Sequence, residues 1–199
     1  MKRLIAAGLL AAALCLTGCS GTNAQKPEEG AASAAEKCGE DGLNIVTEDV
    51  DAVYCDTLRT YFTAIEQKDF DAYCKTMYPP YMESYTEYLK TQDTTPEANF
   101  EKLCKRFDED GYESWKLTSL HLSYYPEEKL DLDGFFDAFK GAGIIDDKFI
   151  EECKKNAEEI RDVQFSLQAL YAGDEEPVTV VSGNEIMMIK TADGTYLFG

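Results

Sequence analysis

The sequence predicts an α+β fold, with amphipathic helices of the N-terminal half packed on a mostly antiparallel sheet. Three kinds of pattern carry this prediction. Apolar residues recur at three- and four-residue spacing between residues 47 and 107, a two-residue alternation follows over 114–125 and 162–171, and turn-forming residues separate short strands near the end. The patterns place one domain over residues 43–199 and leave residues 1–42 outside it.

Residues 1–18 have the layout of a secretory signal peptide. Lys2 and Arg3 are followed by an apolar run from Leu4 to Leu16, and small residues come next. The run is shorter than the roughly 20 apolar residues that a membrane-spanning helix needs. The sequence therefore predicts that the chain is exported.

The motif Leu16-Thr17-Gly18-Cys19 resembles the lipobox of bacterial lipoproteins. The resemblance implies that the thiol of Cys19 receives a diacylglycerol and that the chain is cut just before it. Two acyl chains attach a protein stably, whereas a single chain does so only marginally. Cys15 is a poorer candidate, because the small residue expected directly before the modified thiol is missing there.

Residues 19–42 are predicted to form a flexible tether. They are rich in Gly, Ala, Ser, Glu and Lys and show no apolar periodicity. The chain has a formal net charge of -19, and removal of residues 1–18 would leave -21. Such a charge repels nucleic acid and anionic headgroups, so the lipid must hold the protein to the membrane. The acidity is typical of a well-solvated exported protein and can also attract cationic partners.

The first predicted helix begins at Thr47, whose hydroxyl can cap it. Its apolar residues share one face: Val50, Val53, Tyr54, Leu58, Tyr61, Phe62 and Ile65. Lys68-Asp69 interrupts this pattern. Asp69 is predicted to cap a second, short helix that runs to about Met77 and is stopped by Pro79-Pro80.

Two more helical stretches are expected before the first long strand. The apolar face of the third, a turn or two in length, is formed by Tyr81, Tyr85, Tyr88 and Leu89. The fourth begins at Thr95-Pro96, a capping hydroxyl followed by proline in the first turn, and ends at Gly111. Its buried side is formed by Phe100, Leu103, Cys104 and Phe107.

Residues 114–125 are predicted to form a long strand with two mixed faces. Strict alternation assigns to one face Trp115, Leu117, Ser119, His121, Ser123 and Tyr125. It assigns to the other face Lys116, Thr118, Leu120, Leu122 and Tyr124. Mixed faces are expected where a sheet contacts a core on one side and a groove or partner on the other.

The remaining chain is predicted to form two helices and a series of strands. One helix begins at Asp131 and is broken near Gly141 and Gly143, and the next, capped by Asp146 or Asp147, carries apolar residues as far as Ile160. A strand over 162–171 follows, with turns at 173–177 and 182–184 and a tight hairpin at Asp193-Gly194.

This order of elements resembles the cone-shaped fold of the nuclear transport factor two-like, or cystatin-like, superfamily. The likeness rests on residues 61–72, the Trp115 strand and residues 189–196. It implies a curved sheet that wraps the helices and leaves a pocket for a small molecule, peptide or partner domain. Enzymes of the superfamily place an acid–base pair, often Asp with His or Tyr, in that pocket.

The candidate ligand-binding residues are Trp115, His121, Tyr125, Tyr81 and Tyr85. Tyrosine rings can stack on a sugar or peptide and still offer a polar tip. The spacing of Tyr81 and Tyr85 is also typical of a helix packed on a core, and the core interpretation is favoured.

His121 is the only histidine and the only candidate catalytic residue. It would serve as the acid–base group in an alternative function, a small isomerase or hydrolase acting in the cone pocket. A nucleophile motif and a carboxylate close in sequence are both missing, which favours a structural or solvent-facing histidine in a protein that is not an enzyme.

Five cysteines follow Cys19: Cys38, Cys55, Cys74, Cys104 and Cys153. Export permits disulfides, and an odd number of cysteines leaves at least one thiol without an intrachain partner. One or two bridges are expected, with pairings that the spacing does not define; alternatively, all five are small buried apolar residues. With one histidine and no CxxC motif, neither a metal site nor a cofactor is expected.

The sequence therefore predicts a lipoprotein anchored to the membrane through Cys19. Its domain is expected to bind an unidentified small ligand or protein outside the cytoplasmic membrane, with nucleic acid excluded as a partner by charge.

Overall fold

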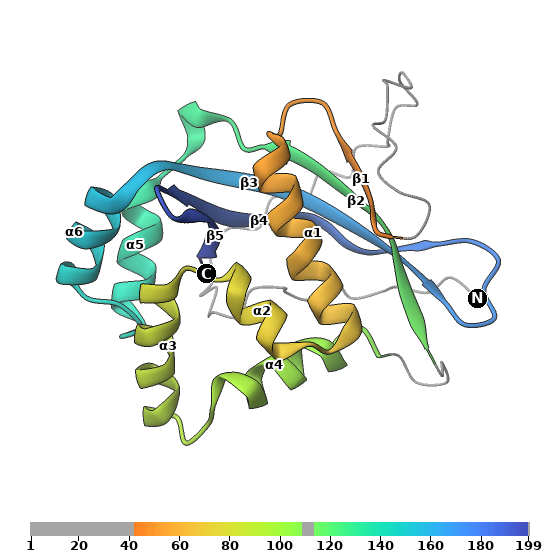
Figure 1. Ribbon diagram of the computed structural model, residues 1–199, viewed down its shortest axis with the longest axis horizontal. Helices are drawn as coiled ribbons and strands as arrows, with labels where there is room; N and C mark the ends of the chain where they lie inside the picture. The colour runs from red at the N-terminus through yellow and green to blue at the C-terminus, as the bar shows by residue number, and fades with distance from the viewer. Residues whose placement is uncertain (1–41, 109–113, 199) are drawn as a thin grey trace, which may run out of the picture.

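The computed structural model describes residues 42–108 and 114–198 (Figure 1). An open five-stranded sheet, in the order β1-β2-β3-β4-β5, forms its centre. β1 runs parallel to β2, and the other neighbouring pairs are antiparallel. The predicted α+β fold with a mostly antiparallel sheet is therefore confirmed. The expected signal peptide, Cys19, Cys38 and most of the tether lie outside the described residues.

The strands are β1 (Asn44–Thr47), β2 (Trp115–Tyr124), β3 (Ala157–Tyr171), β4 (Val178–Thr191) and β5 (Gly194–Phe198). The helices are α1 (Ala52–Gln67), α2 (Phe70–Thr76), α3 (Pro79–Thr91), α4 (Pro96–Lys105), α5 (Leu132–Gly141) and α6 (Asp147–Asn156), with the short 3-10 helix η1 (Glu127–Lys129) after β2. Figure 1 shows α1 lying across the sheet, with α5 and α6 beside the end where β3 begins.

The sequence does not predict β1, and this strand changes how α1 begins. Thr47 ends β1, and its Oγ1 accepts the N–H of Val50 at 3.1 Å in a turn before the helix. α1 starts only at Ala52, after Asp51. The prediction that Thr47 caps the first helix is therefore wrong, because pairing with β2 draws this residue into the sheet. Val53, predicted to be buried, is 43% exposed.

α1 ends, and α2 and α4 begin, at the residues that the sequence predicts. Lys68 ends α1 in the left-handed conformation, with φ 56°. Asp69 caps α2, and its carboxylate accepts the N–H of Ala72 at 2.9 Å. Thr95 caps α4 in the same way, through the N–H of Ala98 at 3.2 Å.

Pro79-Pro80 both stops α2 and opens α3. The two prolines occupy the first positions of α3, where their missing N–H groups cost no helical hydrogen bond. α3 therefore extends over 13 residues, longer than the predicted turn or two. α4 ends at Lys105, before Gly111, which lies outside the described residues.

β2 contains a bulge that corrects the predicted faces. Leu117 pairs with Ala169 whereas Ser119 pairs with Gln168, so Thr118 is an extra residue in β2. The bulge reverses the alternation: buried Leu117 shares its face with buried Leu120 and Leu122, and His121 turns to the opposite face. Strict alternation had placed Leu117 and His121 together.

The boundaries of the last strands also differ from the prediction. α6 is capped by Asp146, one of the two predicted caps, but Ala157 and Ile160 belong to β3. The predicted turn at 182–184 is a bulge within the continuous strand β4, where Gly183 has φ 64°. The hairpin after β4 is confirmed, although Thr191 pairs with Gly194 and its turn comes one residue earlier than predicted.

The sheet is buried on both faces near β5. Met187 and Met188 are neighbours in β4 and point to opposite faces, yet both are buried. On one face, Phe62 of α1 packs on Phe165 of β3 with ring centroids 5.2 Å apart. On the other, Phe198 packs on aromatic rings of α5 and α6, including Phe149 at 5.5 Å. This two-sided core fixes the positions of α1 and β3.

Candidate functional site

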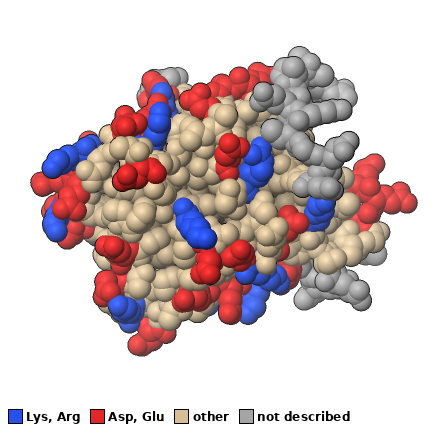
Figure 2. All heavy atoms as spheres, in the orientation of Figure 1, with Lys and Arg blue, Asp and Glu red and all other residues tan. Residues whose placement is uncertain are grey.

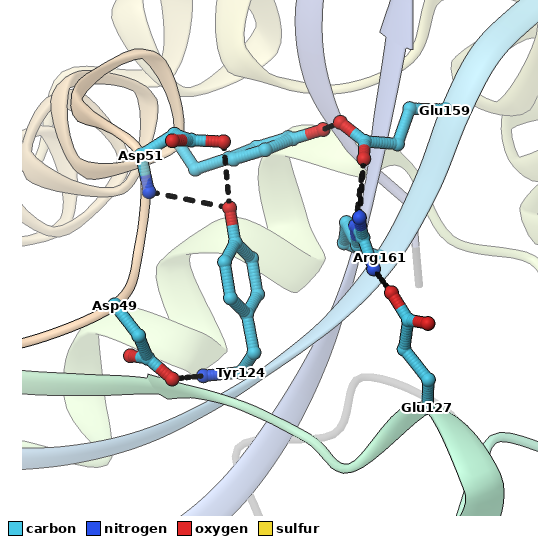
Figure 3. A network of polar contacts seen from close by, with 7 residues as sticks. Asp49, Asp51, Tyr124, Glu127, Glu159 and Arg161 are labelled. Carbon is cyan, nitrogen blue, oxygen red and sulfur yellow. Dashed lines mark hydrogen bonds and ion pairs between the residues drawn. The ribbon is translucent and has the colours of Figure 1, made fainter.

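A cluster of polar side chains joins five elements of the fold at one end of the sheet (Figure 3). We call it the Tyr124 cluster. It consists of Asp49, Asp51, Tyr54, Tyr124, Glu127, Glu159 and Arg161. They come from the loop between β1 and α1, from α1, from the end of β2, from η1 and from the start of β3.

Tyr124 connects the end of β2 to the loop that precedes α1. Its hydroxyl donates to a carboxylate oxygen of Asp51 at 3.0 Å and accepts the backbone N–H of Asp51 at 3.2 Å. The backbone N–H of Tyr124 donates to the carboxylate of Asp49 at 3.3 Å. Two acidic side chains are thereby held in fixed positions above the end of the sheet.

Glu159 links α1 to β3. One carboxylate oxygen accepts the hydroxyl of the buried Tyr54 at 2.6 Å. The other accepts the Nε and Nη2 groups of Arg161, each at 2.7 Å. A guanidinium that offers two N–H groups to one carboxylate makes a geometrically defined pair, because the planar fork has few alternative orientations.

Arg161 lies between two carboxylates and over an aromatic ring. Its third contact is an ion pair with Glu127 of η1, and Figure 3 shows the guanidinium between Glu127 and Glu159. The guanidinium carbon lies 5.4 Å from the centre of the Tyr124 ring, within the range of a cation–π interaction. Tyr54 in turn meets Tyr124 edge to face, with ring centroids 6.2 Å apart.

Burial and charge favour the neutral forms of both tyrosines. Burial, followed by the hydrogen bond to Glu159 and that carboxylate's negative charge, raises the pKa of Tyr54 well above its usual value. Burial is also the main cause that raises the pKa of Tyr124, with the charge of Asp51 contributing. Both hydroxyls therefore act as hydrogen-bond donors at neutral pH.

The cluster carries more negative than positive charge. It holds four carboxylates, those of Asp49, Asp51, Glu127 and Glu159, and one guanidinium, that of Arg161. The side chains of Glu127 and Glu159 are 72% and 31% exposed. Part of each carboxylate thus faces solvent while its orientation is fixed by the contacts behind it. Such an arrangement can accept further hydrogen bonds from an ammonium or guanidinium group.

His121 lies apart from this cluster. It is exposed on β2, pairs in register with Ser166 of β3, and within residues 42–108 and 114–198 its imidazole makes no hydrogen bond or ion pair. An acid–base residue needs a substrate pocket and a partner within hydrogen-bond reach. The described residues supply no such partner for His121.

The other candidate binding residues do not converge on one place. Trp115 lies at the start of β2, where it stacks on Phe107 at 4.9 Å and donates its indole N–H to Asp108 at 2.9 Å. Tyr125 follows the opposite end of the same strand, and its N–H donates to the carbonyl of Asp162 at 2.9 Å. Nine strand residues lie between these two positions.

Tyr81 and Tyr85 are core residues of α3. Both are buried, and their rings stack at 5.5 Å. Tyr81 also packs edge to face on Phe198 at 4.9 Å. The favoured interpretation of their spacing, a helix packed on a core, agrees with these contacts.

The cysteines that the structure describes are all free thiols: Cys55, Cys74, Cys104 and Cys153. Of the two alternatives for the cysteines, the structure therefore favours small apolar residues over bridges at these four positions. Burial raises the pKa of each thiol, to about 11 for Cys153, so the reactive thiolate is scarce at neutral pH.

In the described ranges, no group of three or more His, Cys, Asp or Glu side chains is arranged to hold a metal ion. None of the described helices is long and apolar enough to cross a membrane.

Sequence reasoning missed the Tyr124 cluster because it placed Glu159 and Arg161 near the end of a helix. In β3 they share one face with buried Val163, through the same two-residue alternation that continues to Tyr171. Extending that alternation back toward Ala157 would have identified a strand with a polar end.

Comparisons of the chain with protein-family models, with curated proteins and with solved structures found no match.

Proposed function

We propose that this chain is an exported bacterial lipoprotein, anchored to the outer face of a membrane through lipid on Cys19, whose domain binds a cationic partner without catalysing a reaction. Residues 1–18 act as the signal peptide and residues 19–42 as the tether. With a mean span of about 5 to 6 Å times the square root of its length, the tether holds the domain roughly 25 Å from the anchor.

The order of elements, an open sheet crossed by α1, supports a cone-like arrangement of the domain. Its acidity supports a cationic partner. Figure 2 shows acidic side chains spread over the face that carries α1, with fewer Lys and Arg side chains among them. The full chain has 38 acidic and 19 basic residues, so attraction of cations acts over the whole molecule.

The observation that carries the proposal is the fixed excess of carboxylates in the Tyr124 cluster. Exposed carboxylates that reorient freely lose side-chain entropy when they bind a cation. Those of Asp51, Glu127 and Glu159 are already held by Tyr124, Arg161 and Tyr54. Folding has therefore already ordered these side chains, so binding a cation loses less side-chain conformational entropy.

The test is a calorimetric titration of the full chain with a trilysine peptide at low salt. We expect Glu127→Gln and Asp51→Asn to weaken binding by about two- to fivefold each, the size of one exposed charge contact. Glu83→Gln, which removes an exposed carboxylate from α3, is the matched control and should leave the affinity nearly unchanged.

Equal weakening by all three substitutions would contradict the proposed site, because it would mean that only net charge attracts the peptide. The same conclusion would follow if the affinity did not fall between about 20 and 200 mM salt.

A further inference from the structure

β4 has an open edge along much of its length. The strand extends over 14 residues, but β5 pairs only with Met187–Thr191. Along Val178–Ile186, β3 occupies one edge, and in the described part of the chain no strand occupies the other. Figure 1 shows β5 beside one end of β4, while the rest of β4 continues to the hairpin with β3. Unpaired backbone groups along a sheet edge are a template for another strand.

The other exposed edges of the sheet are short or covered. β1 has four residues. The outer edge of β5 is covered at Leu197, which pairs with Met77 and accepts the N–H of Tyr78 at 2.8 Å. The open edge of β4 is therefore the longest of them in the described structure.

The sequence of this edge favours strand pairing. Val178, Thr179, Val180 and Val181 are β-branched, and Val178–Ile186 contains no Lys, Arg or Pro, the residues that commonly block an edge. Val178, Val180 and Ile186 are half-buried against the core, so part of each side chain remains accessible. Bulges near Val181 and Gly183 interrupt regular pairing and limit the added strand to a short one.

The charges beside the edge define the chemistry of its partner. Glu175, Glu176 and Glu185 are exposed, and no Lys or Arg occurs from Ala172 to Ile189. Opposite charges on paired strands stabilise the pair, whereas like charges destabilise it. An incoming strand that carries lysine or arginine complements this stretch.

A second copy of the chain is a poor occupant of the same edge. Antiparallel pairing of two β4 edges around Ser182 would bring Glu185 of one copy to the Thr179 position of the other, about three residues from Glu176. The resulting repulsion adds to that between two chains with net charges of -19 each.

We propose that the open edge of β4, Val178–Ile186, binds an extended basic segment of a partner polypeptide by β-strand addition. Backbone hydrogen bonds supply the attraction, and the acidic side chains select a cationic strand. This surface shares no residue with the Tyr124 cluster, so the two sites are tested independently.

The test uses amide hydrogen exchange on the full chain with a nine-residue peptide in which Lys alternates with Val or Thr. We expect the peptide to slow exchange in Val178–Ile186 by at least about tenfold, and high salt to reduce the effect. A peptide with Glu in place of Lys should not slow it. Equal protection by both peptides, or no protection of this stretch, would overturn the proposal. Protection that grows with protein concentration alone would overturn it in favour of a second copy.

Substitutions at the edge provide the second readout. Thr179→Lys and Ser182→Lys, both at exposed positions, should together weaken peptide binding by about tenfold or more, since they introduce like charges opposite the incoming strand. The double substitution Glu175→Gln and Glu176→Gln lies in the turn before β4 rather than in the strand. It should weaken peptide binding while β4 itself stays unaltered.

The matched control is Gln92→Lys at the end of α3, which adds the same charge away from the edge. It should change the affinity by less than about twofold. A loss of affinity equal to that of the edge variants would show that net charge, rather than strand addition, governs binding.

Discussion

Asp162 is the most unfavourably placed carboxyl group among the described residues. It is 9% exposed, and its Oδ1 has no hydrogen-bond partner. Burial, with the nearby negative charge of Glu185, raises the pKa of Asp162 to about 7. A hydrogen bond from the backbone N–H of Ile186 lowers the pKa and offsets a smaller part of this rise. The folded chain therefore holds a proton on Asp162 that the unfolded chain has already lost at mildly acidic pH.

This difference predicts how stability depends on pH. The pKa of an unfolded Asp is about 3.9, so between about pH 4 and 7 the folded state binds more protons at this site and the contribution of Asp162 to stability falls as pH rises. Above pH 7 the full cost of burying the charge is present. Asp162→Asn, which removes the charge, should raise the free energy of unfolding at pH 8 by about 1 to 3 kcal/mol and much less at pH 4.5.

Urea unfolding of both proteins at the two pH values provides the measurement. Glu158→Gln, at an exposed position of the same strand, is the control and should change stability by less than about 0.5 kcal/mol at either pH. A gain from Asp162→Asn that is the same at pH 4.5 and pH 8 would show that Asp162 is not protonated in the folded state.

Single residues were predictable where their role is local. Asp69 and Thr95 cap helices in the structure as predicted, Asp146 is one of the two predicted caps of its helix, and Asp131 begins the helix predicted to start there. Contacts across the chain were not: Tyr54 and Glu159 are 105 residues apart and meet only because the whole sheet is assembled.

At the scale of elements, the left-handed residue at the end of α1 provides a direct test of the fold. Lys68 has φ 56°, a conformation that costs a residue with a side chain more than it costs glycine. Lys68→Gly should therefore stabilise the chain by about 0.5 to 1 kcal/mol. The lost contact with Asp108, an exposed ion pair at 3.6 Å, offsets little of this gain.

Thermal unfolding distinguishes the outcomes. Lys90→Gly, inside the last turn of α3, places the same substitution in helical conformation and should destabilise the chain by about 1 kcal/mol. If both substitutions lowered the melting temperature equally, Lys68 would not adopt the left-handed conformation.

The elements that the sequence predicts well are those with a strong period and clear ends. α4 has a cap, a proline and an apolar stripe, and the strand from Val163 to Tyr171 has strict alternation. The misplaced boundaries lie where tertiary pairing decides. β1 has four residues and gains its order from β2, and the bulges of β2 and β4 add residues that no local pattern reveals.

At the scale of the whole molecule, the reactivity of the thiols tests whether the core is packed as the structure shows. Cys55, Cys104 and Cys153 are buried, and burial is the main cause that raises the pKa of each. We expect these three to react with a thiol reagent at least about tenfold faster in urea than in the native chain. A variant lacking Cys15, Cys19 and Cys38 isolates the described cysteines.

The mass of that variant supplies the second readout. After purification in air, the mass should be that of a chain with four free thiols. A disulfide would lower it by the mass of two hydrogens. A disulfide among these four cysteines, or equal thiol reactivity in the folded and unfolded chain, would contradict the structure.

The global architecture could be predicted from the sequence, whereas the proposed binding surfaces could not. An α+β domain with a mostly antiparallel sheet follows from the order of periodic segments. The Tyr124 cluster and the open edge of β4 depend on where β3 begins and where β5 ends, and an error of a few residues in either boundary hides them.

Anchoring through Cys19 is the premise of the proposed function, and one measurement tests it most directly: the intact mass of the protein recovered from the membrane fraction of a bacterial host that matures lipoproteins. The predicted mass is that of residues 19–199 with a diacylglycerol on Cys19, and Cys19→Ala should abolish it and release the protein from the membrane or leave residues 1–18 attached. A chain that retains residues 1–18, or one that is cut but carries no lipid and still stays with the membrane, would contradict the account.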